Sequence, residues 1–415
     1  MCCGFFTKRR RGRLLRLLLF LTAGYVYLFD GGAPSTSVAG VALRRRAPMY
    51  GGSSQPSAAS LAASGATLVW VMLGDTHFQA YLLESIWQAR IFNPRSRFIL
   101  VVDHEWLPGN HSWVPALDLA GVERVYYGAI ADASTRAFGV AYERLWDELG
   151  RRVGAMQPTL NHRTNMAFTQ FTMLRLAALE RLVAVLGLTR VVHIENDQMV
   201  YGSVDALADA ADSCGAALAM TRVGARMAPA VVYAASAPPL RAMLDFIMRV
   251  VEAGPDTAVN VARSTYATDM SLCAAFFDAQ REAGNGTLFA SLPGSGDGSC
   301  IAQRSGLLYD AAGLGTWVAG DFYSPKRFGE VRLGESAVKY WELPFEWRVE
   351  NVTARTADAV PGGAAGAMGR GSLRTPWWNG TRAFNLHVHS KQLHLWSSHD
   401  KEVHEGMLSA SPDRN

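Results

Sequence analysis

Short apolar runs alternate with longer segments of helical spacing between Ala66 and Gly254. Apolar runs bounded by turn residues are typical of strands buried on both faces, and intervening helices provide the crossovers that parallel strands need. The alternation therefore predicts an α/β domain with a mainly parallel sheet sandwiched by helices. The expected strands are 66–74, 97–104, 122–128, 189–197, 215–221 and 229–236, and the expected helices are 78–92, 165–187 and 238–254.

The first thirty residues predict the cellular location. A basic cluster over Lys8–Arg13 precedes an apolar stretch from Leu14 to Phe29. Its length of about sixteen residues is just below the usual requirement for a membrane span, and Arg16 must snorkel. The positive-inside rule makes 1–13 a cytosolic tail and 14–29 the transmembrane signal anchor of a single-pass type II protein. A span this short suits Golgi or ER membranes. A cleaved signal peptide and an organelle transit peptide remain alternatives.

The remaining chain divides by composition. Residues 30–65 are rich in Gly, Ala, Ser and Pro and predict a flexible stem, whereas 66–398 is expected to form the luminal domain. Within that domain 358–374 is expected to be a mobile surface loop, and 399–415 forms a tail. The net charge of +4 includes six basic residues among the first sixteen, which leaves about −2 for the rest. This balance argues against a nucleic-acid partner.

Sequons and cysteines also bear on the compartment. Four N-x-[ST] acceptors favour a secretory lumen and predict N-glycans at Asn110, Asn285, Asn351 and Asn379. Three cysteines lie beyond the stem, at Cys214, Cys273 and Cys300. Three thiols allow at most one internal disulfide and leave one thiol free or paired between chains.

Polar residues follow several expected strands. Ligands of α/β sheets bind beyond the carboxyl ends of the strands, where Gly74, Asp75, Thr76 and Asp103 lie. Glycine lets a backbone approach a ligand closely. We therefore expect these four residues to contribute to a nucleotide site. The alternative is an ordinary strand–helix turn with Asp75 or Thr76 as N-cap.

The sequence Glu195-Asn196-Asp197 follows the apolar run Val191–Ile194. If the strand continues to Asp197, alternation places Glu195 and Asp197 on one face. Two carboxylates side by side repel each other unless a cation lies between them, and Mg²⁺ or Mn²⁺ prefers carboxylate oxygens. The alternative is that both residues only begin a turn.

A second group of polar residues lies near the C-terminus, in "RAFNLHVHSKQLHLW". Period-2 alternation places Asn385, His387 and His389 on one face of a strand, with the histidines about 7 Å apart. Either imidazole could bind a metal, and Lys391 could supply a charge to a phosphate. The alternative is a polar edge strand.

Together, the E-x-D sequence at 195–197 and the H-x-H-S-K sequence at 387–391 resemble motifs of GT-A-fold glycosyltransferases. These enzymes have a Rossmann-like fold, and the resemblance is nearest to the glycogenin-like branch. There a D-x-D signature holds a divalent ion on the diphosphate of a nucleotide-sugar, and a C-terminal H-x-x-G-x-x-K-P segment supplies a histidine and a lysine. The resemblance covers 66–398. In this chain Glu replaces the first Asp, and the glycine and proline are absent.

The resemblance implies a metal-dependent glycosyltransferase with a GT-A-like domain. Its cofactor would be Mn²⁺ or Mg²⁺, its donor a nucleotide-diphosphate-sugar and its acceptor a glycan or a protein. The implied metal ligands are Glu195, Asp197, His387 and His389. The implied donor-site residues are Gly74, Asp75, Thr76, Asp103, Glu195, Asn196 and Lys391, and the implied catalytic residues are Asp269, facing the acceptor, and Lys391.

Weaker expectations concern aromatic and acidic residues elsewhere. Trp377 and Trp378 could stack on a sugar or belong to the core. Asp310 and Asp321 lie in a Gly-rich segment that could line an acceptor cleft.

Three other functions remain open on the sequence, one of which is a stem-anchored structural protein without metal or nucleotide affinity. A zinc hydrolase could use Asp197, His387 and His389. A non-catalytic carbohydrate-binding protein would follow if Glu195 prevents metal binding.

Overall fold

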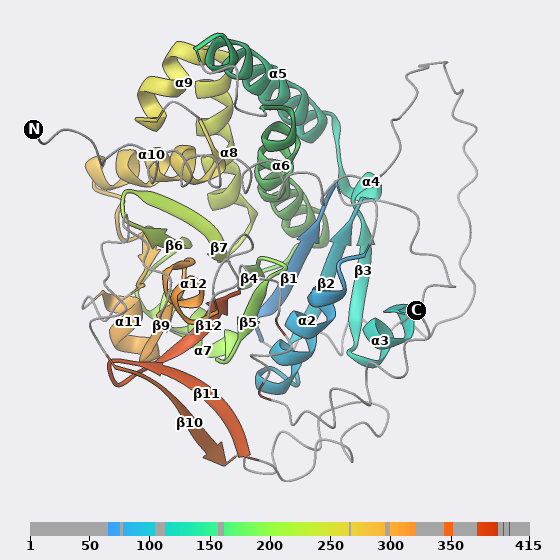
Figure 1. Cartoon of the computed structure of the whole chain (residues 1–415), viewed down its shortest axis with the longest axis vertical. Coiled ribbons are helices and arrows are strands. Elements are labelled where there is room, and N and C mark those ends of the chain that lie inside the picture. The colour runs from blue at the N-terminus through green and yellow to red at the C-terminus, as the bar shows by residue number, and fades with distance from the viewer. Residues whose placement is uncertain are drawn as a thin grey trace, which may run out of the picture. The chain divides into compact units, whose positions relative to one another are not determined.

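The central sheet has seven strands and is mostly parallel (Figure 1). The computed structural model describes residues 65–74, 78–103, 113–156, 162–264, 267–294, 299–319, 344–351, 372–388, 393 and 398. The strands there are β1 (Thr67–Met72), β2 (Arg97–Val102), β3 (Val122–Tyr126), β4 (Val191–Ile194), β5 (Gln198–Val200), β6 (Leu218–Val223), β7 (Arg226–Ala234), β8 (Phe289–Leu292), β9 (Leu307–Tyr309), β10 (Phe345–Asn351), β11 (Ser372–Trp378) and β12 (Thr381–His387). The sheet order is β3-β2-β1-β4-β7-β6-β8, and β7 runs antiparallel to both neighbours. The expected mainly parallel sheet is confirmed.

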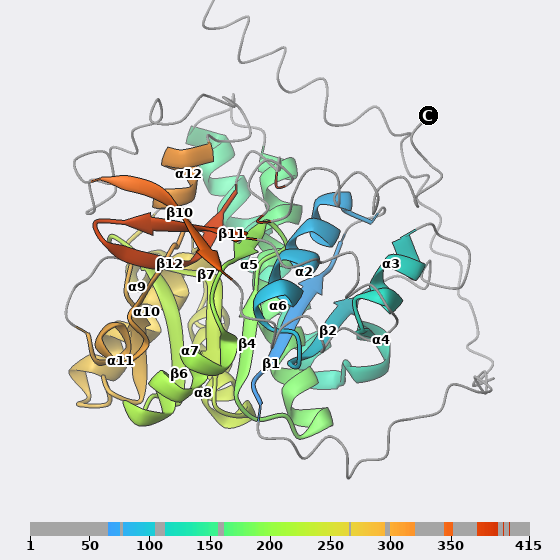
Figure 2. The ribbon, with the colours of Figure 1, turned by 90° about the horizontal axis from the view of Figure 1, so that it is seen from below.

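Helices cover both faces of this sheet (Figures 1 and 2). Their bounds are α2 (Ala80–Phe92), α3 (Trp113–Leu119), α4 (Tyr127–Ile130), α5 (Ala133–Met156), α6 (His162–Leu186), α7 (Val204–Ser213), α8 (Ala237–Glu252), α9 (Pro255–Ala262), α10 (Asp269–Glu282), α11 (Cys300–Ser305) and α12 (Gly313–Ala319). One face of the sheet shares a hydrophobic core with α5, α6, α8 and α10, and the other face shares a core with α2, α3 and α7.

Local sequence explains the main elements. All six residues of β1 are buried, as expected for a strand covered on both faces. The helix α6 ends where the sequence predicted, at Gly187, which has φ +58°. The next residue, Leu188, donates from its N–H to the Val183 carbonyl at 2.9 Å, the bond of a Schellman cap.

A second sheet lies beside the first and has the order β10-β11-β12-β5, with β9 parallel to β12 (Figure 2). The strand β12 is interior, and Ala383–Val388 are all buried. The alternative that the segment with His387 forms a polar edge strand is therefore wrong. The strand β11 begins at Ser372, so the last three residues of the expected loop 358–374 belong to a strand.

Among the three cysteines in the described ranges, Cys214 and Cys300 form a disulfide, and Cys273 is a buried free thiol. This agrees with the expected limit of one internal disulfide. Asn285 and Asn379 are exposed, whereas Asn110 lies outside the described residues.

None of the helices in the described ranges is both long and apolar enough to cross a membrane. The expected anchor Leu14–Phe29 lies outside those ranges.

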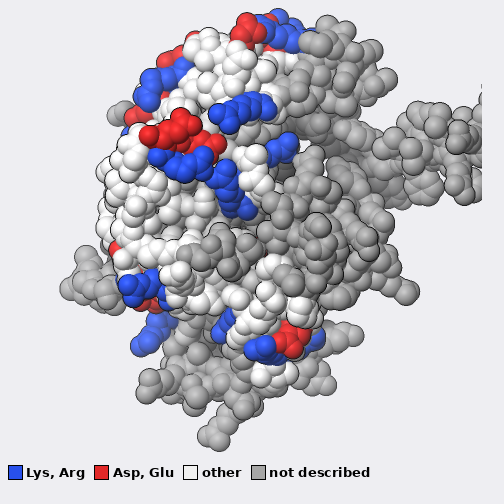
Figure 3. All heavy atoms as spheres, turned by 90° about the vertical axis from the view of Figure 1, so that its left-hand side faces the viewer, with Lys and Arg blue, Asp and Glu red and all other residues white. Residues whose placement is uncertain are grey.

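Charged side chains are scattered on the face shown in Figure 3. Lys and Arg form separate groups there, several of them beside acidic side chains, with uncharged surface between them.

Candidate metal centre

The acidic sequence lies in a turn that joins the two sheets. The strand β4 ends at Ile194, and the Glu195 N–H donates to the Ala230 carbonyl at 3.1 Å. The Gln198 N–H then donates to the Glu195 carbonyl at 3.2 Å, which closes a tight turn before β5. The expectation that the strand extends to Asp197 is therefore wrong. The two carboxylates approach each other because the chain turns, not because side chains alternate along a strand.

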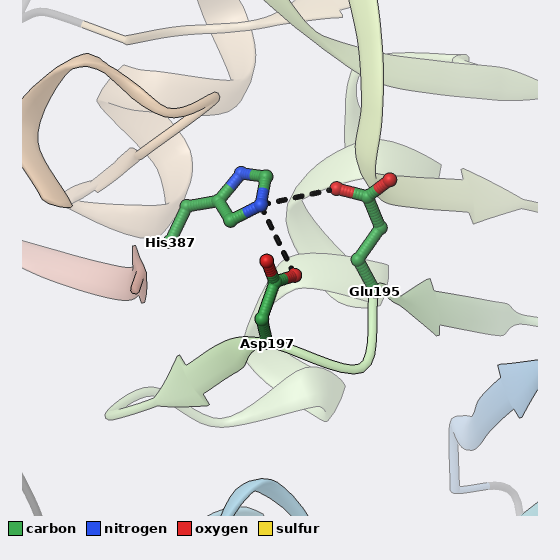
Figure 4. Close-up of side chains that lie close together, drawn as sticks. All are labelled: Glu195, Asp197 and His387. Atoms are coloured by element: carbon green, nitrogen blue, oxygen red, sulfur yellow. Dashed lines mark ion pairs between the residues drawn. The ribbon is translucent and has the colours of Figure 1, made fainter. Parts of the chain in front are cut away.

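The pairing of β5 with β12 brings His387 to this turn. His387 pairs with Gln198, and the Val388 N–H donates to the Asp197 carbonyl at 2.9 Å. The His387 Nε2 lies 3.1 Å from Asp197 Oδ1 and 3.4 Å from Glu195 Oε2 (Figure 4). One ligand atom from each of these three residues lies within 4.8 Å of the others. The structure thus brings together three of the four expected metal ligands. The fourth, His389, lies outside the described residues.

The orientation of His387 suits metal binding. Its Nδ1 lies 3.4 Å from the Ala311 carbonyl, a position from which Nδ1–H can donate. A histidine that donates from one ring nitrogen keeps the other as an acceptor for a metal. The ring therefore directs Nε2 at the two carboxylates.

Sequence reasoning missed Arg175, which lies on α6. Its Nη2 donates to Glu195 Oε1 at 2.5 Å, and both side chains are largely buried. Burial raises the pKa of Glu195, but Arg175 and His387 outweigh burial, so the pKa falls below its usual value. Arg175 therefore holds one oxygen of Glu195, while the other faces His387.

Asp269 begins α10 and lies close enough to this group to interact with it electrostatically. The preceding residue, Thr268, caps the helix by accepting from the Ser271 N–H at 3.3 Å. Burial raises the pKa of Asp269, Glu195 raises it further, and Arg175 opposes the rise. A buried carboxylate with a raised pKa near a metal site is a candidate for proton transfer.

Gly74 and Asp103 meet beyond the ends of β1 and β2. The Gly74 N–H donates to Asp103 Oδ2 at 2.6 Å, and Gly74 has φ +79°. A Cβ on Gly74 would lie 2.3 Å from the Phe171 ring, so this position requires glycine. Nearby, Asn196 Nδ2 donates to Gln79 Oε1, at 3.3 Å, just before α2. The acidic turn is thereby connected to the segment after β1.

Several buried polar atoms near the turn have no protein hydrogen bond within the described structure. They are Arg175 Nε, His193 Nε2, Asn196 Oδ1 and Gln198 Nε2. Most buried polar atoms in folded proteins are paired with protein or water. This local group of unpaired atoms fits a site that binds a polar ligand.

The other expected site residues fall into two groups. Trp378 is buried in the core of the second sheet. The guanidinium carbon Cζ of Arg348 lies 4.0 Å from the centroid of the Trp377 ring. Asp310 is fully buried and lines no cleft. Four expected residues lie outside the described part of the chain: Asp75, Thr76, Asp321 and Lys391.

No family model and no curated protein matches the chain. Two of the solved structures that match it are glycosyltransferases. The PaToxG glycosyltransferase aligns at 11% identity over 54% of this chain and 72% of its own, with a TM-score of 0.32. Mouse xyloside xylosyltransferase 1, in its apo form, aligns at 12% identity over 55% of this chain and 85% of its own, also with a TM-score of 0.32. A TM-score of 0.32 at 11–12% identity does not establish a shared function.

Proposed function

We propose that this protein is a metal-dependent glycosyltransferase with a GT-A-like domain. One observation carries the proposal: Glu195, Asp197 and His387 gather their ligand atoms within 4.8 Å at the turn that follows β4. Ligands of α/β sheets bind at the carboxyl ends of the strands, where β1 and β2 also place Gly74 and Asp103. The proposed donor is a nucleotide-diphosphate-sugar, and the acceptor is a glycan or a protein.

The residues present fit a divalent metal ion. Glu195 and Asp197 would supply carboxylate oxygens, and His387 would supply Nε2. Oxygen-rich sets of this kind suit Mn²⁺ or Mg²⁺, which keep further positions for water and substrate phosphates. Such an ion, when bound, stabilises the negative charge of a leaving diphosphate.

The residues around the metal site have distinct proposed roles. Asp103 holds the Gly74 backbone in a conformation that lets a nucleotide approach closely, and Asn196 lies beside the donor. Arg175 orients Glu195 through their ion pair. Asp269 faces the acceptor, and its carboxylate accepts the proton that the acceptor hydroxyl releases as the new glycosidic bond forms. The roles of Asp75, Thr76, His389 and Lys391 stay as the sequence predicts them.

The proposed location is the lumen of the Golgi or ER, behind a type II signal anchor. The disulfide between Cys214 and Cys300 supports this location, because disulfides persist in oxidising compartments. Exposed sequons at Asn285 and Asn379 also suit a luminal domain.

The proposal is tested with the detergent-solubilised full-length protein. We would follow thermal melting with a panel of nucleoside diphosphates, with and without Mn²⁺, and then assay hydrolysis of the matching nucleotide-sugar. We expect one nucleotide to raise the melting temperature only with Mn²⁺, and Asp197→Asn to abolish both the shift and the hydrolysis. Asp147→Asn changes an exposed acid on α5 and is the matched control, with wild-type behaviour.

Three outcomes would contradict the proposal. Full hydrolysis by Asp197→Asn would remove the metal site from the reaction. A response to Zn²⁺ alone, with no nucleotide effect, would favour the hydrolase. Glycan binding without turnover of any nucleotide-sugar would favour the carbohydrate-binding protein.

A further inference from the structure

Asp310 is a fully buried carboxylate whose four hydrogen bonds all come from backbone N–H groups. It follows β9 and precedes α12. Its Oδ1 accepts from Ala312 N at 3.0 Å and from Leu314 N at 2.9 Å. Its Oδ2 accepts from Gly315 N at 2.6 Å and from His387 N at 2.9 Å. Three of these bonds cap the start of α12, but the fourth comes from the proposed metal ligand on β12.

Further contacts connect this segment to β12. The Asp310 N–H donates to Asn385 Oδ1 at 3.0 Å, and Asn385 Nδ2 donates to the Asp310 carbonyl at 2.8 Å. A Cβ on Gly315 would lie 2.2 Å from the His387 carbonyl oxygen, so α12 packs directly on the His387 backbone. The adjacent Ala311 carbonyl faces His387 Nδ1. The segment 310–315 therefore contacts both the backbone and the ring of His387.

We propose that Asp310 is a positioning residue for His387. One carboxylate oxygen, Oδ2, fixes the His387 backbone. The other, Oδ1, fixes the turn that carries the Ala311 carbonyl. Together these contacts direct Nε2 toward Glu195 and Asp197. This inference rests on the proposed metal centre. It assigns control of metal affinity to a residue between β9 and α12 that does not touch the metal.

The expected size of the effect follows from other metal sites. Residues that orient metal-binding histidines typically change metal affinity by 10- to 100-fold when they are replaced. Asp310→Asn keeps the size of the side chain but replaces one accepting oxygen by an NH₂ group. That group faces backbone N–H donors and cannot accept from them.

The test is a double-mutant cycle on Mn²⁺ affinity, measured by titration calorimetry on the full-length protein without nucleotide. We expect Asp310→Asn to weaken Mn²⁺ binding about 10- to 100-fold in the wild-type background. We expect it to change binding less than about 2-fold in a His387→Ala background, because Asp310 acts through His387. Pulsed EPR of bound Mn²⁺ should show coupling to an imidazole nitrogen in wild type, and this coupling should weaken in Asp310→Asn and vanish in His387→Ala.

Two further variants separate positioning from general stability. Glu180→Gln alters another buried carboxylate, which pairs with Arg241 on α8, and should keep wild-type Mn²⁺ affinity. A Cβ on Gly315 would lie 2.2 Å from the His387 carbonyl oxygen and 2.7 Å from Asp310 Oδ2, so Gly315→Ala should weaken Mn²⁺ binding as Asp310→Asn does. This variant provides the test if Asp310→Asn does not fold.

The outcomes are distinguishable. Equal losses of affinity with and without His387, or an unchanged nitrogen coupling, would overturn the role of Asp310 alone. Absence of Mn²⁺ binding in wild type would overturn both this role and the proposed metal centre. If the double-mutant cycle gives the expected Mn²⁺ affinities but the protein turns over no nucleotide-sugar, the positioning role of Asp310 stands and the proposed glycosyltransferase activity is refuted.

Discussion

Replacing Arg175 by methionine tests whether Glu195 depends on its ion pair. The two side chains are 11% and 16% exposed, and the Nη2–Oε1 distance is 2.5 Å. Removing one partner of a buried pair typically costs 3–5 kcal/mol, because the other charge stays buried without compensation. Both groups here keep some contact with solvent, so we expect Arg175→Met to lower the free energy of unfolding by about 2–4 kcal/mol.

The measurement is urea unfolding at pH 7 with EDTA present, for Arg175→Met, Glu195→Gln and the double variant. We expect the double variant to lose about 1–3 kcal/mol less than the sum of the single losses, because the second substitution removes the orphaned charge. Arg97→Met is the control. It breaks an ion pair with Glu123 in which the side chains are 26% and 45% exposed, and we expect a cost below about 1 kcal/mol.

Two results would refute this reasoning. Arg175→Met could lose no more stability than Arg97→Met, or the two single losses could add fully in the double variant. Either result would mean that Glu195 is held by other contacts of the turn, such as the bond from its N–H to the Ala230 carbonyl.

Three further predictions concern the scaffold, each measured as a change in the free energy of unfolding. Cys214→Ser should cost about 4 kcal/mol, since the disulfide joins residues 86 positions apart, and reducing agent should remove its difference from wild type. Asp132→Ala removes the N-cap of α5 and should cost about 1 kcal/mol at pH 7. Hydrogen bonds from Thr135 and Ser134 lower the pKa of Asp132. The stabilisation from ionised Asp132 is therefore present above the unfolded-state pKa of about 3.9 and is lost as pH falls through the folded-state value. The stability difference between wild type and Asp132→Ala should shrink in acid. Arg90→Lys should cost about 2 kcal/mol, because the buried guanidinium donates to carbonyls in several directions, including those of Ala120 and Ser96, and an ammonium group cannot do the same.

Much of the central sheet was predictable because its signals are local. The strands β1, β2 and β4 are apolar runs bounded by turn residues, and α6 ends at the glycine that marks its cap. Burial on both faces forces such runs to be apolar throughout, so the pattern survives in the sequence. The residues Gly74, Asp103 and Glu195 lie just after these strands, at the carboxyl edge of the sheet.

The second sheet was not predictable in the same way. The strands β5 and β9 have only three residues each, and they pair with β12, which is far away in sequence. A three-residue strand has no measurable period, and its partner is chosen by long-range packing. The resemblance implied that the E-x-D sequence and His387 share one site, and the structure brings them together. The strand geometry expected for the acidic residues is wrong, because Glu195–Gln198 form a turn.

Arg175 and Asp310 were missed or misplaced for a related reason. An arginine within an apolar helix carries no local sign of its partner, which lies 20 residues further along the chain. Asp310 lies in a Gly-rich segment, which suggested a surface cleft. The glycines have a different cause there, since Gly315 allows α12 to approach the His387 backbone.

The geometry also suggests why glutamate can occupy the first acidic position of the motif. A carboxylate has two oxygens, and Glu195 divides them: Oε1 pairs with Arg175 on α6, and Oε2 faces His387 on β12. The longer side chain lets one residue at the turn contact both elements. An aspartate, shorter by one methylene, would have to give up one of these contacts or shift the turn. Glu195→Asp should therefore weaken the ion pair with Arg175 even if the metal site keeps its ligands. In an Arg175→Met background, glutamate and aspartate at position 195 should give the same free energy of unfolding.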